Sequence, residues 1–160
     1  MIQRIQSLFL LLVMFAMTAF FFFPIASYID IINNKYYKFS ILGLKHISPD
    51  PEPIVSSFFT IPLAIITIAI FVLALTALFS YKKRKHQVKL CRMNMFVNII
   101  LLLLIFFFYA PSIEKYTNDS TDYLGEAGIY FPLISIIFLL LAIRSIIRDE
   151  KLIRSADRLR

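Results

Sequence analysis

The sequence predicts an all-α integral membrane protein with four transmembrane helices and a last helix that extends into the cytoplasm. Hydrophobic residues make up 59% of the 160 residues, compared with about 45–50% in typical globular domains. Four stretches contain the roughly 20 mostly apolar residues that a helix needs to cross a bilayer. The basic residues gather beside some ends of these stretches and not others, which is typical of an oriented membrane protein.

The four expected spans cover residues 7–29, 55–81, 95–113 and 129–147, joined into one transmembrane domain over residues 1–160. Span one is longer than the apolar core of about 7–15 residues found in a cleaved signal peptide, so we expect it to be retained. Span two contains Pro62. A proline inside a helix removes a backbone hydrogen bond, which predicts a helix kink at Pro62.

Lysines and arginines predict the orientation of the spans. Thirteen of the 17 basic residues lie before span one, in the loop 82–94, or from Arg144 to the C-terminus. Cytoplasmic segments are enriched in lysine and arginine. We therefore expect the N-terminus, the loop 82–94 and the tail 148–160 to be cytoplasmic.

The first outer loop contains the stretch KYYKFSILGLKH, in which strand-forming residues surround Gly43. This pattern favours a short β-hairpin over the end of the bundle. The second outer loop is acidic and polar, and we expect it to be solvated.

The tail has an apolar stripe and a basic stripe at helical spacing, so span four is expected to continue as one amphipathic helix. Two interpretations remain open for the tail: an anchor on anionic headgroups, or an apolar stripe that docks on a protein partner or on the chain's own cytoplasmic loop. The basic loop is interpreted first as an orientation signal and second as a headgroup contact. Nucleic-acid binding is disfavoured because the loop lacks interleaved aromatics. The candidate contact residues are Lys82, Lys83, Arg84, Lys85, Arg148, Lys151, Arg154 and Arg158.

Several function classes find little support in the residues. The central parts of the spans carry no charge, whereas ion pumps and proton-coupled carriers usually need ionisable groups at that depth. Neither of the two histidines lies in a span, and Cys91 is the only cysteine, so we expect no catalytic site, metal or cofactor. Asn98 is expected to be an interfacial amide in contact with water, and the alternative is a hydrogen bond from its side chain to another helix.

The stretches MIQRIQSLFLLL and RDEKLIRSADRLR, at the two ends of the chain, resemble domain-of-unknown-function family 4293. This is a family of uncharacterised bacterial four-span membrane proteins found mainly in the Bacteroidota, and many members close with a similar tail. The resemblance covers the whole chain and implies a multi-pass protein of the bacterial inner membrane. It implies no activity, cofactor or catalytic residue.

We therefore expect a non-enzymatic inner-membrane protein that acts through lipid or protein partners at its basic loop and tail. The expected partners are anionic headgroups, a membrane or cytoplasmic protein, or a second copy of the chain. The alternative is a small transporter or channel subunit for an apolar or amphipathic solute. It is motivated by the prolines and phenylalanines that fall in the outer half of the spans.

Overall fold

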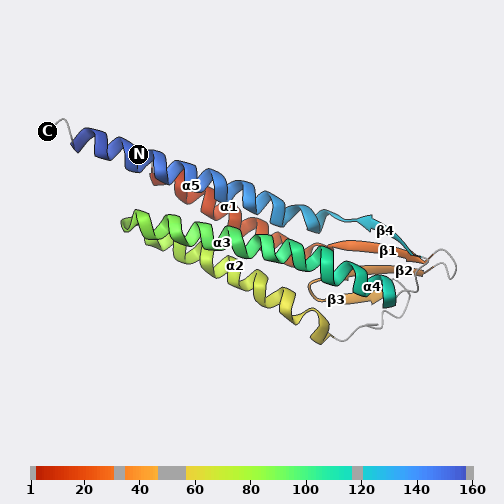
Figure 1. Cartoon of the computed structure of the whole chain (residues 1–160). Helices are drawn as coiled ribbons and strands as arrows, with labels where there is room; N and C mark the ends of the chain where they lie inside the picture. The colour runs from red at the N-terminus through yellow and green to blue at the C-terminus, as the bar shows by residue number, and fades with distance from the viewer. Residues whose placement is uncertain (1–2, 31–34, 47–56, 117–120, 158–160) are drawn as a thin grey trace.

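The structure, a computed structural model, describes residues 3–30, 35–46, 57–116 and 121–157. It is an elongated bundle of helices with a small sheet at one end (Figure 1). The long helices are α1 (Gln3–Phe22), α2 (Ile61–Phe79), α3 (Arg84–Leu104) and α5 (Tyr130–Asp157). Each contains a candidate membrane span by length and composition, which confirms the four-span prediction.

The four helices form a ring in which α1 packs against α2 and α5, and α3 packs against the same two helices. Buried positions recur with the alternating three- and four-residue spacing of a coiled-coil seam. They include Gln6, Leu10, Val13, Met17 and Phe20 on α1; Leu63, Thr67, Ile70, Ala74 and Ala77 on α2; Gln87, Cys91, Asn94, Asn98 and Leu101 on α3; and Ser135, Leu139, Ala142, Ile146 and Asp149 on α5. The outward faces carry large apolar side chains such as Phe15 and Phe107, as expected where lipid is the solvent.

A π-helical turn, η3 (Ile105–Tyr109), follows α3 and leads into α4 (Ala110–Tyr116). The extra residue of a π turn rotates the helix face. The spacing of buried residues on α3 would place Phe108 inside, yet Phe108 is exposed and Tyr109 is fully buried. The Tyr109 hydroxyl donates a hydrogen bond of 2.8 Å to the carbonyl of Phe59.

The sheet consists of β1 (Ala26–Asp30), β2 (Lys35–Ser40), β3 (Gly43–His46) and β4 (Thr121–Gly125), all antiparallel in the order β3-β2-β1-β4. The predicted hairpin is confirmed as β2–β3. The expectation that span one runs to residue 29 was wrong, because α1 ends at Phe22 and residues 26–30 form the central strand β1. Pro24, which lacks a backbone donor, lies between the helix and the strand.

The sheet shares one hydrophobic core with the nearest turns of the helices. Phe20 of α1, Phe39 of β2 and Tyr109 of η3 are all buried in it. Backbone contacts fix the junction: the Gly128 N–H donates to Pro24 at 2.9 Å and the Ile25 N–H donates to Phe39 at 2.8 Å. The sheet is therefore a packed cap, and we call strands β1–β4 the cap.

Two further expectations need correction. α2 begins at Ile61, so Pro62 lies in the first turn, where a proline costs no helical hydrogen bond. The expected kink at Pro62 is therefore wrong. The segment 84–94, expected as part of a loop, forms the first turns of α3. α5 is continuous to Asp157 and reaches past the other helices (Figure 1), as predicted for the tail.

Candidate functional site

The end of the bundle opposite the cap contains the start of α1, the connection between α2 and α3, and the end of α5 (Figure 1). We call this part of the chain, residues 3–9, 79–92 and 144–157, the basic end. It contains most of the lysines and arginines among the described residues. The folding of four antiparallel helices brings together basic segments that lie far apart in the sequence.

The candidate contact residues take several positions at the basic end. Lys83, Lys85, Arg148 and Lys151 are exposed, and Arg84 is half-buried at the first position of α3. The side chains of Lys82 and Arg154, and the whole of Arg158, lie outside the described structure. The exposed cations therefore come from two separate elements: the start of α3 and the last turns of α5.

Gln6 of α1 and Asp149 of α5 form a buried pair at this end. Their exposed fractions are 4% and 5%, and the Gln6 Nε2 donates a hydrogen bond to the Asp149 Oδ2. A carboxylate is costly to bury unless it is hydrogen-bonded, so the amide donor stabilises this position. The pair also brings the two stretches that carry the family resemblance into contact, because Gln6 lies in MIQRIQ and Asp149 in RDEKL.

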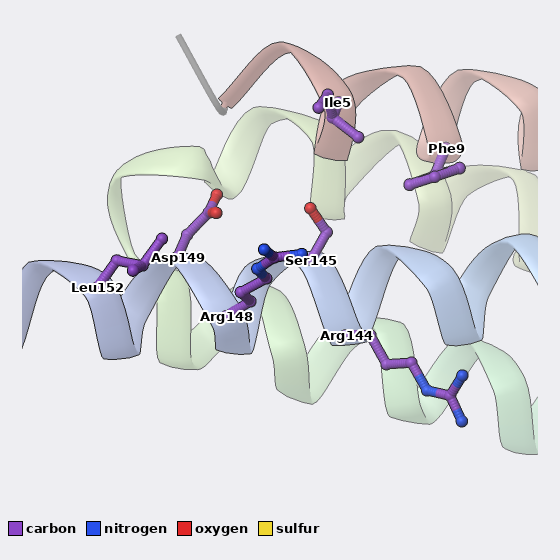
Figure 2. A pocket seen from close by; sticks show the side chains of 7 residues that line it. All are labelled: Ile5, Phe9, Arg144, Ser145, Arg148, Asp149 and Leu152. Carbon is purple, nitrogen blue, oxygen red and sulfur yellow. The ribbon is translucent and has the colours of Figure 1, made fainter.

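A pocket of about 450 Å³ lies beside this pair, between α1 and α5 (Figure 2). Its apolar lining is Ile5, Phe9 and Leu152, and its polar lining is Arg144, Ser145, Arg148 and Asp149. In Figure 2 the Ser145 hydroxyl points toward α1 and the Arg148 guanidinium lies beside Ser145. The Arg144 side chain extends away from α1 in the same view. The pocket thus combines exposed cations with an apolar wall.

A second group of polar side chains lies inside the bundle. We call Gln87, Asn94 and Asn98, all buried on one face of α3, the polar seam. The Asn94 Nδ2 donates to the Ile70 carbonyl at 3.1 Å, and the Asn98 Nδ2 donates to the Ser135 Oγ at 2.9 Å. The side-chain oxygens of all three residues are buried without a hydrogen-bond partner among the described atoms.

The favoured expectation for Asn98, an amide in contact with water, was wrong, because its side chain is fully buried. The alternative, a hydrogen bond to another helix, is confirmed. The sequence reasoning also missed Gln6, Gln87, Asn94 and Asp149 as interior residues. Their spacing carries the signal that could have found them: Gln87, Asn94 and Asn98 share a heptad-like stripe with Cys91. Polar residues that recur at coiled-coil spacing within an apolar helix face other helices, since lipid offers them no partner.

Cys91 is buried on the same stripe. Within the described ranges, no three histidine, cysteine, aspartate or glutamate side chains come close enough to hold a metal ion. Among the described residues, the arrangement combines exposed cations at the surface, hydrogen-bonding amides in the interior, and a pocket with polar and apolar lining between α1 and α5.

Comparison with known proteins gives a family. No curated protein matches the sequence. The family model described as domain of unknown function (DUF4293) matches residues 2–159, nearly the whole chain, so the four helices and the cap together correspond to one family unit. The chain belongs to the DUF4293 family.

Proposed function

We propose that this chain is a multi-pass protein of the bacterial inner membrane with both termini in the cytoplasm. It acts through a partner that contacts its basic end, and not as an enzyme. The observation that supports this most directly is the shared position of both termini and the α2–α3 connection at the basic end (Figure 1). Cytoplasmic segments are enriched in lysine and arginine, and the described residues at the cap end include Glu114 and Glu126.

The last turns of α5 are the strongest candidate for the contact. The end of α5 reaches past the other helices (Figure 1). Before that end, alongside the start of α1, Arg148 and Lys151 are exposed and Leu152 is 50% exposed. An exposed leucine beside two cations can contact either an anionic membrane surface or an acidic protein partner that has an apolar patch. Each basic residue near anionic headgroups contributes about 1 kcal/mol to membrane binding.

Orientation is tested by cysteine labelling. Cys91→Ala gives a cysteine-free background, into which Lys85→Cys or Lys45→Cys is introduced; both lysines are exposed, at opposite ends of the molecule. In intact spheroplasts, a membrane-impermeant maleimide should label the cysteine at position 45. The cysteine at position 85 should react only after permeabilisation. The reverse pattern would contradict the proposed orientation.

The partner is tested by affinity purification in mild detergent. The full-length chain is compared with a chain that ends at Glu150, which removes Lys151, Leu152 and the rest of the tail but keeps Asp149 and its contact with Gln6. A Lys45→Glu variant, changed at the cap end, serves as the matched control. We expect a stoichiometric partner that is lost from the truncated chain and kept by the control. A homo-oligomer that is the same in all three would argue against a partner at the tail.

The alternative function, a small transporter or channel subunit for an apolar or amphipathic solute, has one observation in its favour. A groove of about 270 Å³ lies between α1 and α2, lined by Met17, Thr18, Phe21, Phe22, Thr67, Ile68 and Phe71. The expected kink at Pro62 no longer supports this alternative, because Pro62 lies in the first turn of α2. Solute flux in proteoliposomes that is unchanged by Phe71→Ala would argue against this alternative.

A further inference from the structure

The pocket between α1 and α5 has the composition of a site for an amphiphilic anion. Arg148 and Ser145 supply hydrogen-bond donors from adjacent turns of α5, and Figure 2 shows the guanidinium beside the serine. Arg144 also lines the pocket, and its side chain extends away from α1. Guanidinium groups bind phosphate oxygens with two parallel hydrogen bonds, which fixes geometry as well as charge.

The α1 side of the pocket is apolar, with Ile5 and Phe9, and Leu152 adds an apolar side chain from α5. Ile5 and Leu152 are each 50% exposed, so about half of each side chain is available to a ligand. Phe9 lies further along α1, toward the cap. A small soluble anion gains nothing from such a wall, whereas a ligand with a hydrocarbon portion gains from covering it. The wall therefore favours a phosphate that is joined to a lipid.

Asp149 is the one acidic group in the pocket lining. Its contacts limit how strongly it would repel an anionic ligand. Gln6 donates a hydrogen bond to it, and the carboxylate is 5% exposed. In Figure 2 the carboxylate turns toward α1, whereas the Arg148 guanidinium lies on the side of Ser145. The guanidinium and the hydroxyl that would meet a phosphate therefore lie together on the Ser145 side, away from the carboxylate.

We propose that this pocket binds the phosphate of an anionic phospholipid. Arg148 and Ser145 hold the phosphate, and the start of the acyl chains lies against Ile5 and Phe9. The inference rests on the proposed function in one respect, because that function places the basic end at the level of the inner-leaflet headgroups. The inference goes beyond a diffuse basic surface, because it names one binding site and the class of lipid that the site binds.

The test uses purified full-length protein in detergent, titrated with phosphatidylglycerol or with phosphatidylcholine of the same acyl chains and followed by native mass spectrometry. We expect phosphatidylglycerol to bind more tightly. Arg148→Gln should weaken its binding roughly tenfold, the usual effect of losing a hydrogen bond to a charged group. Ser145→Ala should weaken it less. Arg148→Lys, which keeps the charge and loses the fork of donors, should fall between the wild type and Arg148→Gln.

Lys151→Gln is the matched control, since Lys151 is an exposed cation on the same helix that does not line the pocket. It should change binding by no more than about twofold, as is usual for an exposed charge. Equal binding of the two lipids, or an equal loss in Arg148→Gln and Lys151→Gln, would overturn the inference. Displacement of phosphatidylglycerol by millimolar inorganic phosphate would also overturn it, by assigning the pocket to free phosphate.

This result can be separated from the test of the proposed function. Binding in detergent does not depend on which way the protein faces in a membrane. A reversed labelling pattern would overturn the proposed orientation and leave the lipid preference intact. Correct labelling without a lipid preference would overturn the lipid site alone.

Discussion

Gln6 on α1 and Asp149 on α5 are 143 residues apart in the sequence, and they share a buried hydrogen bond in the folded bundle. The contact joins the first turns of the chain to the last turns of the membrane-spanning part of α5. It lies beside an apolar cluster that includes Leu10, Ala142 and Ile146. The pair therefore closes the ring of helices at the basic end.

Gln6→Ala should lower the stability of the bundle by about 1–3 kcal/mol, because it leaves a buried carboxylate without its donor. The double variant Gln6→Leu with Asp149→Leu should be closer to the wild type, since neither polar partner remains. Thermal unfolding in detergent, followed by circular dichroism, measures both effects. Lys151→Ala, at an exposed position of α5, is the control. A loss of stability in the double variant equal to the sum of the losses in Gln6→Leu and Asp149→Leu, each measured alone, would mean that the two residues do not interact.

Tyr109→Phe should cost about 1 kcal/mol, because the Phe59 carbonyl loses the hydroxyl donor that now lies at 2.8 Å. The ring contacts would remain, including the stacked contact with Phe39 at 5.6 Å between ring centroids. Tyr109→Ala should cost more, about 3–5 kcal/mol, because it empties a fully buried position. Thermal unfolding gives the ranking. Phe107→Ala, on the exposed face of the same turn, should have a small effect. A similar loss for Phe107→Ala and Tyr109→Ala would contradict the placement of Tyr109 in the core and of Phe107 on the exposed face.

The long spans and the hairpin were predictable because their signals are local. Hydropathy over about 20 residues identifies a membrane helix, and the strand-forming stretch around Gly43 marks β2–β3. β1 and β4 gave no such signal. The segment 26–29 continues an apolar run, and it becomes a strand because β2 and β4 pair with it on both sides. That pairing is a long-range contact, which no window along the sequence contains.

The buried face of each span was hard to predict for a related reason. In a soluble helix the apolar residues mark the core, but here apolar side chains cover the lipid face as well. In these spans, the polar residues are the ones that identify the buried face of a helix. Asn98 and Ser135 look isolated in their separate spans, and each is explained only by the other across the bundle. The start of α3 at Arg84 was missed because its first turns are charged.

Asn98→Ala should destabilise the bundle by about 0.6–1.7 kcal/mol, the range measured for hydrogen bonds between membrane helices. Ser135→Ala should cost a similar amount, and the double variant should cost little more than either single variant, because both single variants remove the same bond. Thr18→Ala is the control, since Thr18 is exposed and its hydroxyl donates a hydrogen bond to the Met14 carbonyl of its own helix. Fully additive losses for Asn98→Ala and Ser135→Ala would contradict the pairing.

Gly128→Ala should destabilise the junction between the cap and the helices. A Cβ at this position would lie 2.3 Å from the Pro24 carbonyl oxygen, a backbone atom that the Gly128 N–H also binds. Overpacking of this kind typically costs about 1–3 kcal/mol. Protease resistance of the cap and thermal unfolding would both report the change. Ala127→Ser, at the exposed neighbouring position, should leave both unchanged. Wild-type behaviour of Gly128→Ala would place the Pro24 segment further from α5 than the structure does.

Pro62→Ala tests how α2 begins. If Pro62 bent the middle of a span, its replacement would straighten the helix and change its packing, but Pro62 is exposed in the first turn. A proline there occupies a position without a helical hydrogen bond to lose, so the change in stability should stay within about 0.5 kcal/mol. Ile68→Pro is the matched comparison, at an exposed position in the interior of the same helix. It should cost about 3 kcal/mol or more. A large effect of Pro62→Ala on thermal unfolding would show that α2 extends further toward the N-terminus than Ile61.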